Sequence, residues 1–366
     1  MRVALVIAGP YPSPRGSQVL VSHLAAGLGR RGHDVRVVSY GPGRCERPGP
    51  RPARLGRDAM LLARLWRVAR RERVDVLHAH NYEAAIAALV VGRVTGRPVV
   101  YHGHSAHAAE LPLYASRPAA RRWLARLGGL LDRHVPRRAD CCVAVSAGLA
   151  DRLRTAGLPS RDLVCLEPAS PPDELDDDWA GPGQDAVACY AGNLDAYQDV
   201  EHLLRAFAIV RAAAPDARLR LVSHADARGH ATRLAVRGLG PGVEVVLAGS
   251  YDEVRAELRR AAVAVCPRTE GSGFPMKLLT YMAMGKAIVA SAGSAKNLVD
   301  GVTARVVPDG DTGAFADALR SLLWDPVARE RLGRAARGAV QGGEAWDEGL
   351  TRIEAIYRRL LTNNTE

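Results

Sequence analysis

The stretch that decides the fold runs from Arg268 to Ser291, RTEGSGFPMKLLTYMAMGKAIVAS. Its glycine-rich turn precedes Pro275 and an apolar segment of helical spacing, which Gly285 closes. Proline suits the first turn of a helix and glycine the residue just past its end, so the pattern predicts a helix followed by a buried strand at Ile288 and Val289. A helix entered from a glycine turn directs unpaired backbone N–H groups at that turn, which favours a bound anion. An ordinary strand-to-helix connection has the same pattern, so the choice between an anion site and a plain connection depends on the rest of the chain.

Composition indicates a globular protein of two domains. The chain has 366 residues, which is more than one hydrophobic core usually serves. Hydrophobic residues make up 48% and charged residues 24%, as in ordinary soluble proteins. The six cysteines show no C-x-x-C spacing, so we expect reduced thiols in a cytosolic protein. The apolar segments at 3–8 and 84–91 are too short for a secretory signal or a membrane span.

Charge is divided unevenly along the chain. Residues 1–166 hold 27 Arg and 11 acidic residues, a net charge of +16, whereas the remainder holds 23 basic and 28 acidic residues, a net charge of −5. This asymmetry predicts that the first half meets an anionic ligand or surface. A compositional preference for Arg over Lys explains the choice of basic residue but not the asymmetry. Because no aromatic residues are interleaved with the charges in a known motif, we do not expect a nucleic-acid partner.

Alternating strands and helices predict two doubly wound α/β domains with parallel sheets. We expect a first domain at 1–167, a linker rich in Pro, Gly and Asp at 168–185, a second domain at 186–343 and a closing helix at 344–366. The expected strands lie at 1–8, 33–38, 74–79, 98–102, 141–145 and 163–166 in the first domain, and at 186–191, 218–222, 243–247, 262–266 and 287–290 in the second. The cleft between two such domains is the default ligand site.

Six segments in order resemble the glycosyltransferases of the GT-B fold, and within them the retaining family 4, also called group 1. They are VDVLHAH, RPVVYHGH, ADCCVAVSAGLADRL, YAGNLDAYQDVEHLLRAF, EGSGFPMKLLTYMAMGKAIVAS and the closing WDEGLTRIEAIYRRLL. The resemblance implies two Rossmann-like domains that face across a cleft, with the closing helix crossing back to the first domain. It also implies metal-independent, hexosyltransferase-like transfer from a UDP- or GDP-linked sugar, bound mostly by the second domain, to a hydroxyl acceptor held by the first.

In the first domain the resemblance places four residues near the substrates. Gly16 matches a glycine whose backbone approaches the donor phosphates, although a plain turn before a helix has the same local sequence. Arg15 and His102 fall on the acceptor side, and His104 matches the histidine near the transferred sugar and is a candidate catalytic residue. Together with His107, His102 and His104 form an H-x-H-x-x-H pattern that is also compatible with a metal cluster, but no acidic or cysteine ligand is placed to complete it.

The histidines of the preceding strand, His78 and His80, have a simpler interpretation. They stand in LHAH at a strand end, and we expect them to pack there or to support neighbouring residues of the site.

The phosphate-binding part of the second domain departs from the family pattern. Where the family has G-R-L followed by K-G, this chain has Asn193 and Gln198 at the positions of the arginine and the lysine. Neutral amides donate weaker hydrogen bonds than cations do, so Lys277 and Arg268 are the candidates that restore the charge. The donor-binding set that the resemblance implies also contains Gly273 and Phe274.

The acidic pair of the family is also altered. Two glutamates usually stand eight residues apart, but eight residues after Glu270 lies Leu278, which can fill neither role. Alignment on GFPMKLLTYMA instead puts Ser272 and Thr280 at the two positions, and Thr280 can still bind a ribose hydroxyl. Glu270 then either faces the sugar as a catalytic residue or is a solvated acid in the turn.

The segment 117–138, RPAARRWLARLGGLLDRHVPRR, is basic and amphipathic and contains Trp123. Such a face can rest on an anionic membrane, and membrane-docked members of this fold use a similar helix. The alternative is a surface helix packed by its leucines, and Gly128 and Gly129 weaken a continuous helix.

The sequence therefore predicts a cytoplasmic retaining glycosyltransferase, with the inner membrane face as a candidate peripheral location. Its product would be a glycan, a glycolipid or a glycosylated metabolite. The alternative, from another class, is a non-catalytic GT-B protein that binds a partner enzyme or a sugar, because the usual Arg, Lys and second Glu are missing.

Overall fold

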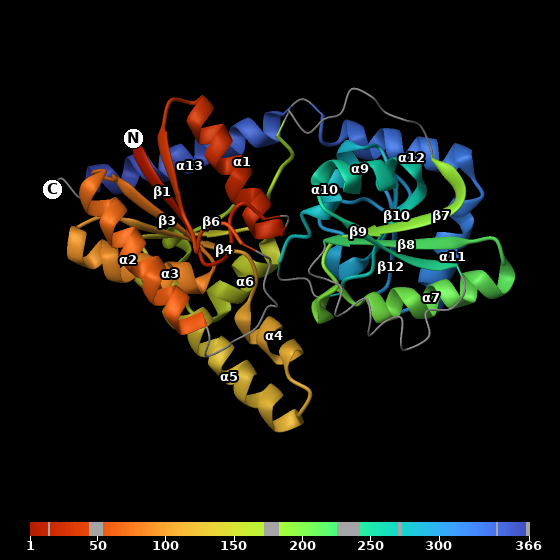
Figure 1. Cartoon of the computed structure of the whole chain (residues 1–366), viewed down its shortest axis with the longest axis horizontal. Coiled ribbons are helices and arrows are strands. Elements are labelled where there is room, and N and C mark those ends of the chain that lie inside the picture. Colours follow the sequence, from red (N-terminus) through yellow and green to blue (C-terminus); the bar gives the residue numbers. More distant parts are fainter. Residues whose placement is uncertain are drawn as a thin grey trace. The chain divides into compact units, whose positions relative to one another are not determined.

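The computed structural model divides the chain into two compact units. Unit 1 contains Met1–Pro168, Ser272–Phe274 and Ala345–Glu366, and unit 2 contains Ala169–Gly271 and Pro275–Glu344. Each unit is built around one six-stranded parallel sheet (Figure 1). The structure describes residues 1–13, 15–43, 54–171, 183–224, 242–269, 273–341 and 343–363. Most of the linker expected at 168–185 lies outside these residues.

The sheet of unit 1 has the strand order β2-β1-β3-β4-β5-β6. Its strands are β1 (Arg2–Ile7), β2 (Asp34–Val38), β3 (Val76–His80), β4 (Val99–Gly103), β5 (Cys141–Ala144) and β6 (Leu163–Cys165). Its helices are α1 (Gly16–Arg30), α2 (Leu55–Arg71), α3 (Tyr82–Thr95), α4 (His107–Glu110), α5 (Pro118–His134), α6 (Ala147–Thr155) and α13 (Glu344–Asn363). Apart from β2 and the short β6, these strands are buried on both faces, as strands covered by helices on both sides are.

Right-handed crossovers assign the helices of unit 1 to opposite faces of the sheet. The chain moves one way from β1 to β2 and the other way afterwards, so α1 covers one face while α2 and α3 cover the other (Figure 1). Helix α13 joins α1, because Gly27 lies against the side chains of Trp346 and Leu350. Glu354 of α13 is also bonded by Arg31 and His33, which anchors the closing helix to unit 1.

The sheet of unit 2 has the order β12-β11-β10-β7-β8-β9. Its strands are β7 (Gln184–Ala191), β8 (Arg218–His224), β9 (Val243–Ala248), β10 (Ala261–Cys266), β11 (Ala287–Ser291) and the short β12 (Arg305–Val307), which the sequence did not predict. Its helices are α7 (Val200–Ala213), α9 (Tyr251–Arg260), α10 (Lys277–Ala283), α11 (Thr312–Leu323) and α12 (Pro326–Gly338). One core lies under α7 and α11 around Phe207 and Phe315, and another lies under α9 and α10 around Tyr281 (Figure 1).

The predicted two-domain α/β class with parallel sheets is confirmed, and the predicted strands coincide with the observed ones to within about three residues at each end. The helix expected after Pro275 is shorter than its sequence pattern indicates: α10 has seven residues, and Gly285 follows it with φ of 64°. Among the described residues, no helix is both long and apolar enough to cross a membrane.

Helix α5 is continuous through its two adjacent glycines, which have different surroundings. A Cβ on Gly128 would lie 2.3 Å from the carbonyl oxygen of His107 in α4, whereas a Cβ on Gly129 would meet nothing within 4 Å. Gly128 therefore allows α4 and α5 to pack with their backbones in contact, and Gly129 has no such role.

We expect opposite effects on stability when each glycine is replaced by alanine. Gly128→Ala forces the two helices apart and should lower the free energy of unfolding by about 1–3 kcal/mol. Gly129→Ala only improves helix propensity and should raise it by about 0.5–1 kcal/mol. Urea unfolding followed by circular dichroism measures both, and equal effects of the two changes would contradict the assigned role of Gly128.

Candidate active site

Four histidines form an array at the carboxyl end of the sheet in unit 1. His78 and His80 are alternate residues of β3, His102 belongs to β4 and His104 follows it. Alternate residues of a strand share a face, and the register pairs His80 with His102, so all four rings lie together. Neighbouring ring centroids are 4.7–5.3 Å apart.

The array is held by hydrogen bonds between ring nitrogens. His78 Nε2 faces His102 Nδ1 at 3.1 Å, and His80 Nδ1 faces His104 Nε2 at 3.0 Å. The other nitrogen of His78, Nδ1, is bonded to the hydroxyl of Tyr357 in α13. The Nε2 atoms of His80 and His102 are buried and have no hydrogen-bond partner among the described residues.

Burial keeps these four imidazoles neutral. It lowers the pKa of His78 to about 3 and that of His104 to about 4. The pKa values of His80 and His102 are also far below their ordinary value, because burial and the neighbouring imidazoles both oppose a positive charge. At physiological pH each ring therefore carries one N–H and one lone pair.

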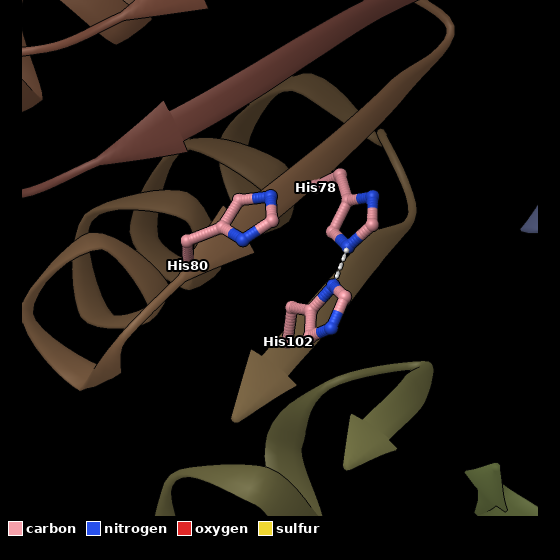
Figure 2. A group of neighbouring side chains, drawn as sticks. All are labelled: His78, His80 and His102. Carbon is pink, nitrogen blue, oxygen red and sulfur yellow. Dashed lines mark hydrogen bonds between the residues drawn. The ribbon is translucent and has the colours of Figure 1, made fainter. Parts of the chain in front are cut away.

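Neutral imidazoles are also metal ligands, and one nitrogen of each of His78, His80 and His102 lies within 4.8 Å of the others. A zinc-type ion requires nitrogens about 2.0–2.1 Å away. The lone pair that binds the ion lies in the plane of each ring, but these three rings are nearly parallel, with interplanar angles of 9–25° (Figure 2). Two of these rings already share a hydrogen bond, between His78 Nε2 and His102 Nδ1, so the array as it stands suits hydrogen bonding better than coordination.

His107, the last histidine of the H-x-H-x-x-H pattern, is bonded to Asp132 of α5. The Asp132 carboxylate accepts hydrogen bonds from the backbone N–H and Nδ1 of His107, at 3.0 and 2.9 Å, and from the N–H of Ala108 at 2.9 Å. Burial opposes a charge on His107, but the hydrogen bond and charge of Asp132 outweigh it and raise the pKa of His107. Asp132 was not predicted from the sequence, because it stands inside the amphipathic helix and shows no distinguishing signal there.

Arg15 and Gly16 begin the helix that follows β1. Arg15 is the N-cap residue of α1, and Gly16 is its first residue. Because β1 pairs with β3 in register, with Ile7 opposite His80, this helix start lies at the same edge of the sheet as the histidine array.

In unit 2, Lys277 lies in a polar cage at the carboxyl end of β7. Its Nζ donates to Gln198 Oε1 at 2.9 Å and lies 3.8 Å from the ring centroid of Tyr190. Gly192, with φ of 146°, leaves room for the ammonium group, because a Cβ there would lie 2.8 Å from Nζ. Burial and the nearby Arg268 lower the pKa of Lys277 to about 7.

Arg268 follows β10 and is 7% exposed. Its guanidinium carbon lies 5.1 Å from the ring centroid of Tyr197, and the hydroxyl of Tyr197 accepts a hydrogen bond from Asn193 Nδ2 at 2.9 Å. Gln198 thus accepts a hydrogen bond from Lys277 itself, and Asn193 donates one to Tyr197, over whose ring Arg268 lies.

The other implied donor-binding residues lie in one or the other unit or outside the described residues. Thr280 lies in α10, and its hydroxyl is 3.1 Å from that of Tyr251. Gly273 and Phe274 are both buried, and they precede Pro275 and α10 in the chain. Glu270 and Ser272 lie outside the described residues.

Comparison with known proteins gives matches along the chain. Residues 14–169 match the family described as Glycosyltransferase Family 4, and residues 185–325 match the family described as Glycosyl transferases group 1. A phosphatidyl-myo-inositol mannosyltransferase of Mycobacterium leprae is 28% identical over 388 residues, which cover 100% of this chain and 99% of the relative.

Solved structures share the fold at lower identity. Sucrose-phosphate synthase from Thermosynechococcus elongatus matches with a TM-score of 0.82 at 18% identity, covering 99% of this chain and all of that one. HepE of Anabaena, solved in complex with UDP, matches with a TM-score of 0.70 at 16% identity, covering 97% of this chain and 99% of that one.

The two matched families follow each other along the chain in the order of its two units and together span most of it. Both are families of sugar-transferring enzymes, which leaves the non-catalytic alternative without support. The chain therefore belongs to the group 1, family 4 glycosyltransferases, which are retaining enzymes of the GT-B fold that transfer a sugar from a nucleotide sugar to an acceptor.

Proposed function

We propose that unit 2 binds the diphosphate of a UDP- or GDP-linked sugar through Lys277 and Arg268, with the nucleotide sugar as co-substrate and no resident cofactor. The observation that carries this proposal is a pair of buried basic residues: Lys277 lies against Gly192, and Arg268 is close enough to lower the pKa of Lys277. A diphosphate would relieve their mutual repulsion and the cost of burying them. The complex of HepE with UDP is consistent with a uridine nucleotide.

The leaving group of the reaction explains why cations are needed there. Negative charge builds up on the diphosphate oxygens as the bond to the sugar breaks, and fixed positive groups stabilise that charge. Asn193 and Gln198 cannot supply it, but they can fix the tyrosines and the lysine around the phosphates. We assign Thr280 to the ribose hydroxyls and Ser272 to the hydroxyls of the sugar. Glu270 is assigned to the sugar as well.

In unit 1 we assign His104 to the transferred sugar, Gly16 to the donor phosphates, and His102 and Arg15 to the acceptor side. An acceptor that carries both a hydroxyl and a negative charge suits the net charge of +16 over residues 1–166. The name of the Mycobacterium leprae relative indicates a phospholipid acceptor. A phosphorylated polyol, free or in a lipid, is therefore the acceptor class to test first.

Helix α5 supports a peripheral position on the cytoplasmic membrane face. Trp123 is 62% exposed and Leu130, seven residues on, is 55% exposed. Its exposed arginines are Arg117, Arg121, Arg122, Arg126 and Arg133. Exposed apolar side chains flanked by cations are typical of helices that lie on anionic lipid.

Calorimetric titration with UDP, GDP, ADP and dTDP tests the proposed donor site. We expect micromolar binding of UDP or GDP and at least about tenfold weaker binding to the Lys277→Met variant, because a charge-assisted contact to phosphate is lost. Arg320→Met is the matched control, because Arg320 lies in the last turn of α11, towards the amino ends of the strands and away from the proposed site. Lack of binding by a cooperatively folded protein, or equal affinities of the two variants, would contradict the proposal.

Binding should also take up a proton in a defined pH range. Free Lys277 has a pKa of about 7 and is mostly neutral at pH 8, whereas a bound diphosphate raises that pKa and restores the charge. We expect uptake of nearly one proton at pH 8 and little at pH 6, so affinity should fall as pH rises from the pKa of free Lys277 to its raised pKa in the complex. Titrations in buffers of different ionisation enthalpy measure this uptake, and Lys277→Met should abolish it at pH 8.

The membrane assignment predicts binding to anionic vesicles but not to neutral ones. Trp123→Ala should weaken sedimentation with phosphatidylglycerol vesicles several-fold, because an inserted aromatic ring is lost. Trp324→Ala removes a tryptophan that is 42% exposed in unit 2 and should have no effect. Equal losses in the two variants, or binding unaffected by lipid charge, would remove α5 as the docking face.

A further inference from the structure

The position of the proton on each imidazole of the array follows from its partners. A neutral histidine carries one N–H and one lone pair, and the hydrogen bond at one nitrogen decides the state of the other. Two nitrogens of the array, Nε2 of His80 and Nε2 of His102, are buried without a partner among the described residues. Buried N–H groups that lack an acceptor are rare in native proteins, so these two atoms carry lone pairs and the protons lie on Nδ1.

For His102, this assignment orders one chain of hydrogen bonds. Its Nδ1–H donates to His78 Nε2 at 3.1 Å, so His78 must carry its own proton on Nδ1. That Nδ1–H then donates to the hydroxyl oxygen of Tyr357. Both hydrogen bonds therefore run in the same direction, from His102 through His78 to the closing helix α13.

For His80, the same rule determines which nitrogen of His104, the candidate catalytic histidine, carries the proton. His80 Nδ1–H donates to His104 Nε2 at 3.0 Å, so Nε2 of His104 is an acceptor and its proton lies on Nδ1. His104 is half-buried, and its Nδ1 makes no hydrogen bond within the part of the chain that the structure describes. The ring therefore has an N–H group available to a ligand.

We propose that His80 is a positioning residue, which fixes His104 as the Nδ1–H tautomer so that His104 presents a hydrogen-bond donor, and not a base, to the bound substrate. This inference rests on the proposed function for the place of His104 beside the sugar. His80 itself touches no substrate, because it is fully buried. His78, His102 and Tyr357 support it by closing the array on its other sides.

The chemistry of the site depends on this tautomer. A donor at Nδ1 can bind a sugar or acceptor oxygen, whereas a lone pair there would repel that oxygen and could only accept a proton from a hydroxyl. The Nε2 lone pair of His104, the other basic position, is already occupied by His80. His104 thus contributes orientation and electrostatic stabilisation of an oxygen without removing a proton.

Proton positions can be measured without any turnover. In protein labelled with ¹⁵N-histidine, two-bond ¹H–¹⁵N correlations separate protonated from unprotonated ring nitrogens, and the His104→Gln variant assigns the signals of His104. We expect Nδ1 protonated and Nε2 unprotonated in His104 at pH 7.5. Protonation on Nε2 in the wild-type protein would overturn the proposal, even if nucleotide binding supports the donor site.

Two variants of nearly equal size separate positioning from simple packing. His80→Asn keeps an N–H donor where Nδ1 was, so kcat/KM should stay within about threefold of wild type, whereas His80→Asp puts an acceptor there. The carboxylate draws the His104 proton to Nε2 and raises the pKa of His104. Among the described residues, the titratable groups near His104 are the neutral His78, His80 and His102 and the more basic His107.

The two variants should therefore differ in their pH profiles. In His80→Asp, kcat/KM should fall at least about tenfold as pH rises through the new pKa of His104, because Nδ1 loses its proton there. His80→Asn and wild type should show no such step. Thermal melting reports whether each variant is folded, and nucleotide affinity reports whether the proposed donor site is intact. Equal losses in both variants at every pH would show that His80 only fills space.

Discussion

Parallel strand pairing in a fixed register is the constraint on which both candidate sites depend. In unit 1 it places His80 opposite His102, and the alternation of side chains then brings His78 and His104 to the same face. A shift of one residue in either strand would turn its two histidines to the opposite face and dissolve the array. In unit 2 the loop after β7, with Gly192, and the residues after β10, with Arg268, lie at the same end of the sheet for the same reason.

The fold was predictable because its signals are local and periodic. Buried apolar runs, glycines past helix ends and the order of elements suffice to predict two parallel α/β units. The short strand β12 was missed, because three residues carry too little pattern. Helix α10 was overestimated, because its apolar sequence continues past Met284 as buried turn and strand.

The sites were less predictable, because their partners lie far apart in the sequence. Lys277 and Gln198 are 79 residues apart, yet they share a hydrogen bond. The aromatic partners Tyr190 and Tyr197 have no signal beyond ordinary core tyrosines. The histidine array did leave a signal, two H-x-H patterns on consecutive strands, but treating H-x-H-x-x-H as one unit obscured it. His107 in fact pairs with Asp132, and His102 and His104 pair with the histidines of β3.

In the proposed donor site, the lysine lies on a helix and not in the loop where the family resemblance implies one, and burial of this lysine has an electrostatic advantage while the site is empty. Arginine stays charged in any protein environment, whereas burial can deprotonate lysine. With a pKa of about 7, Lys277 can shed its charge when no anion is present and so lessen its repulsion with Arg268. Gln198 accepts a hydrogen bond from the amine in either state, and the Tyr190 ring favours the charged one. The site therefore keeps one permanent charge and gains the second when an anion is present to balance it.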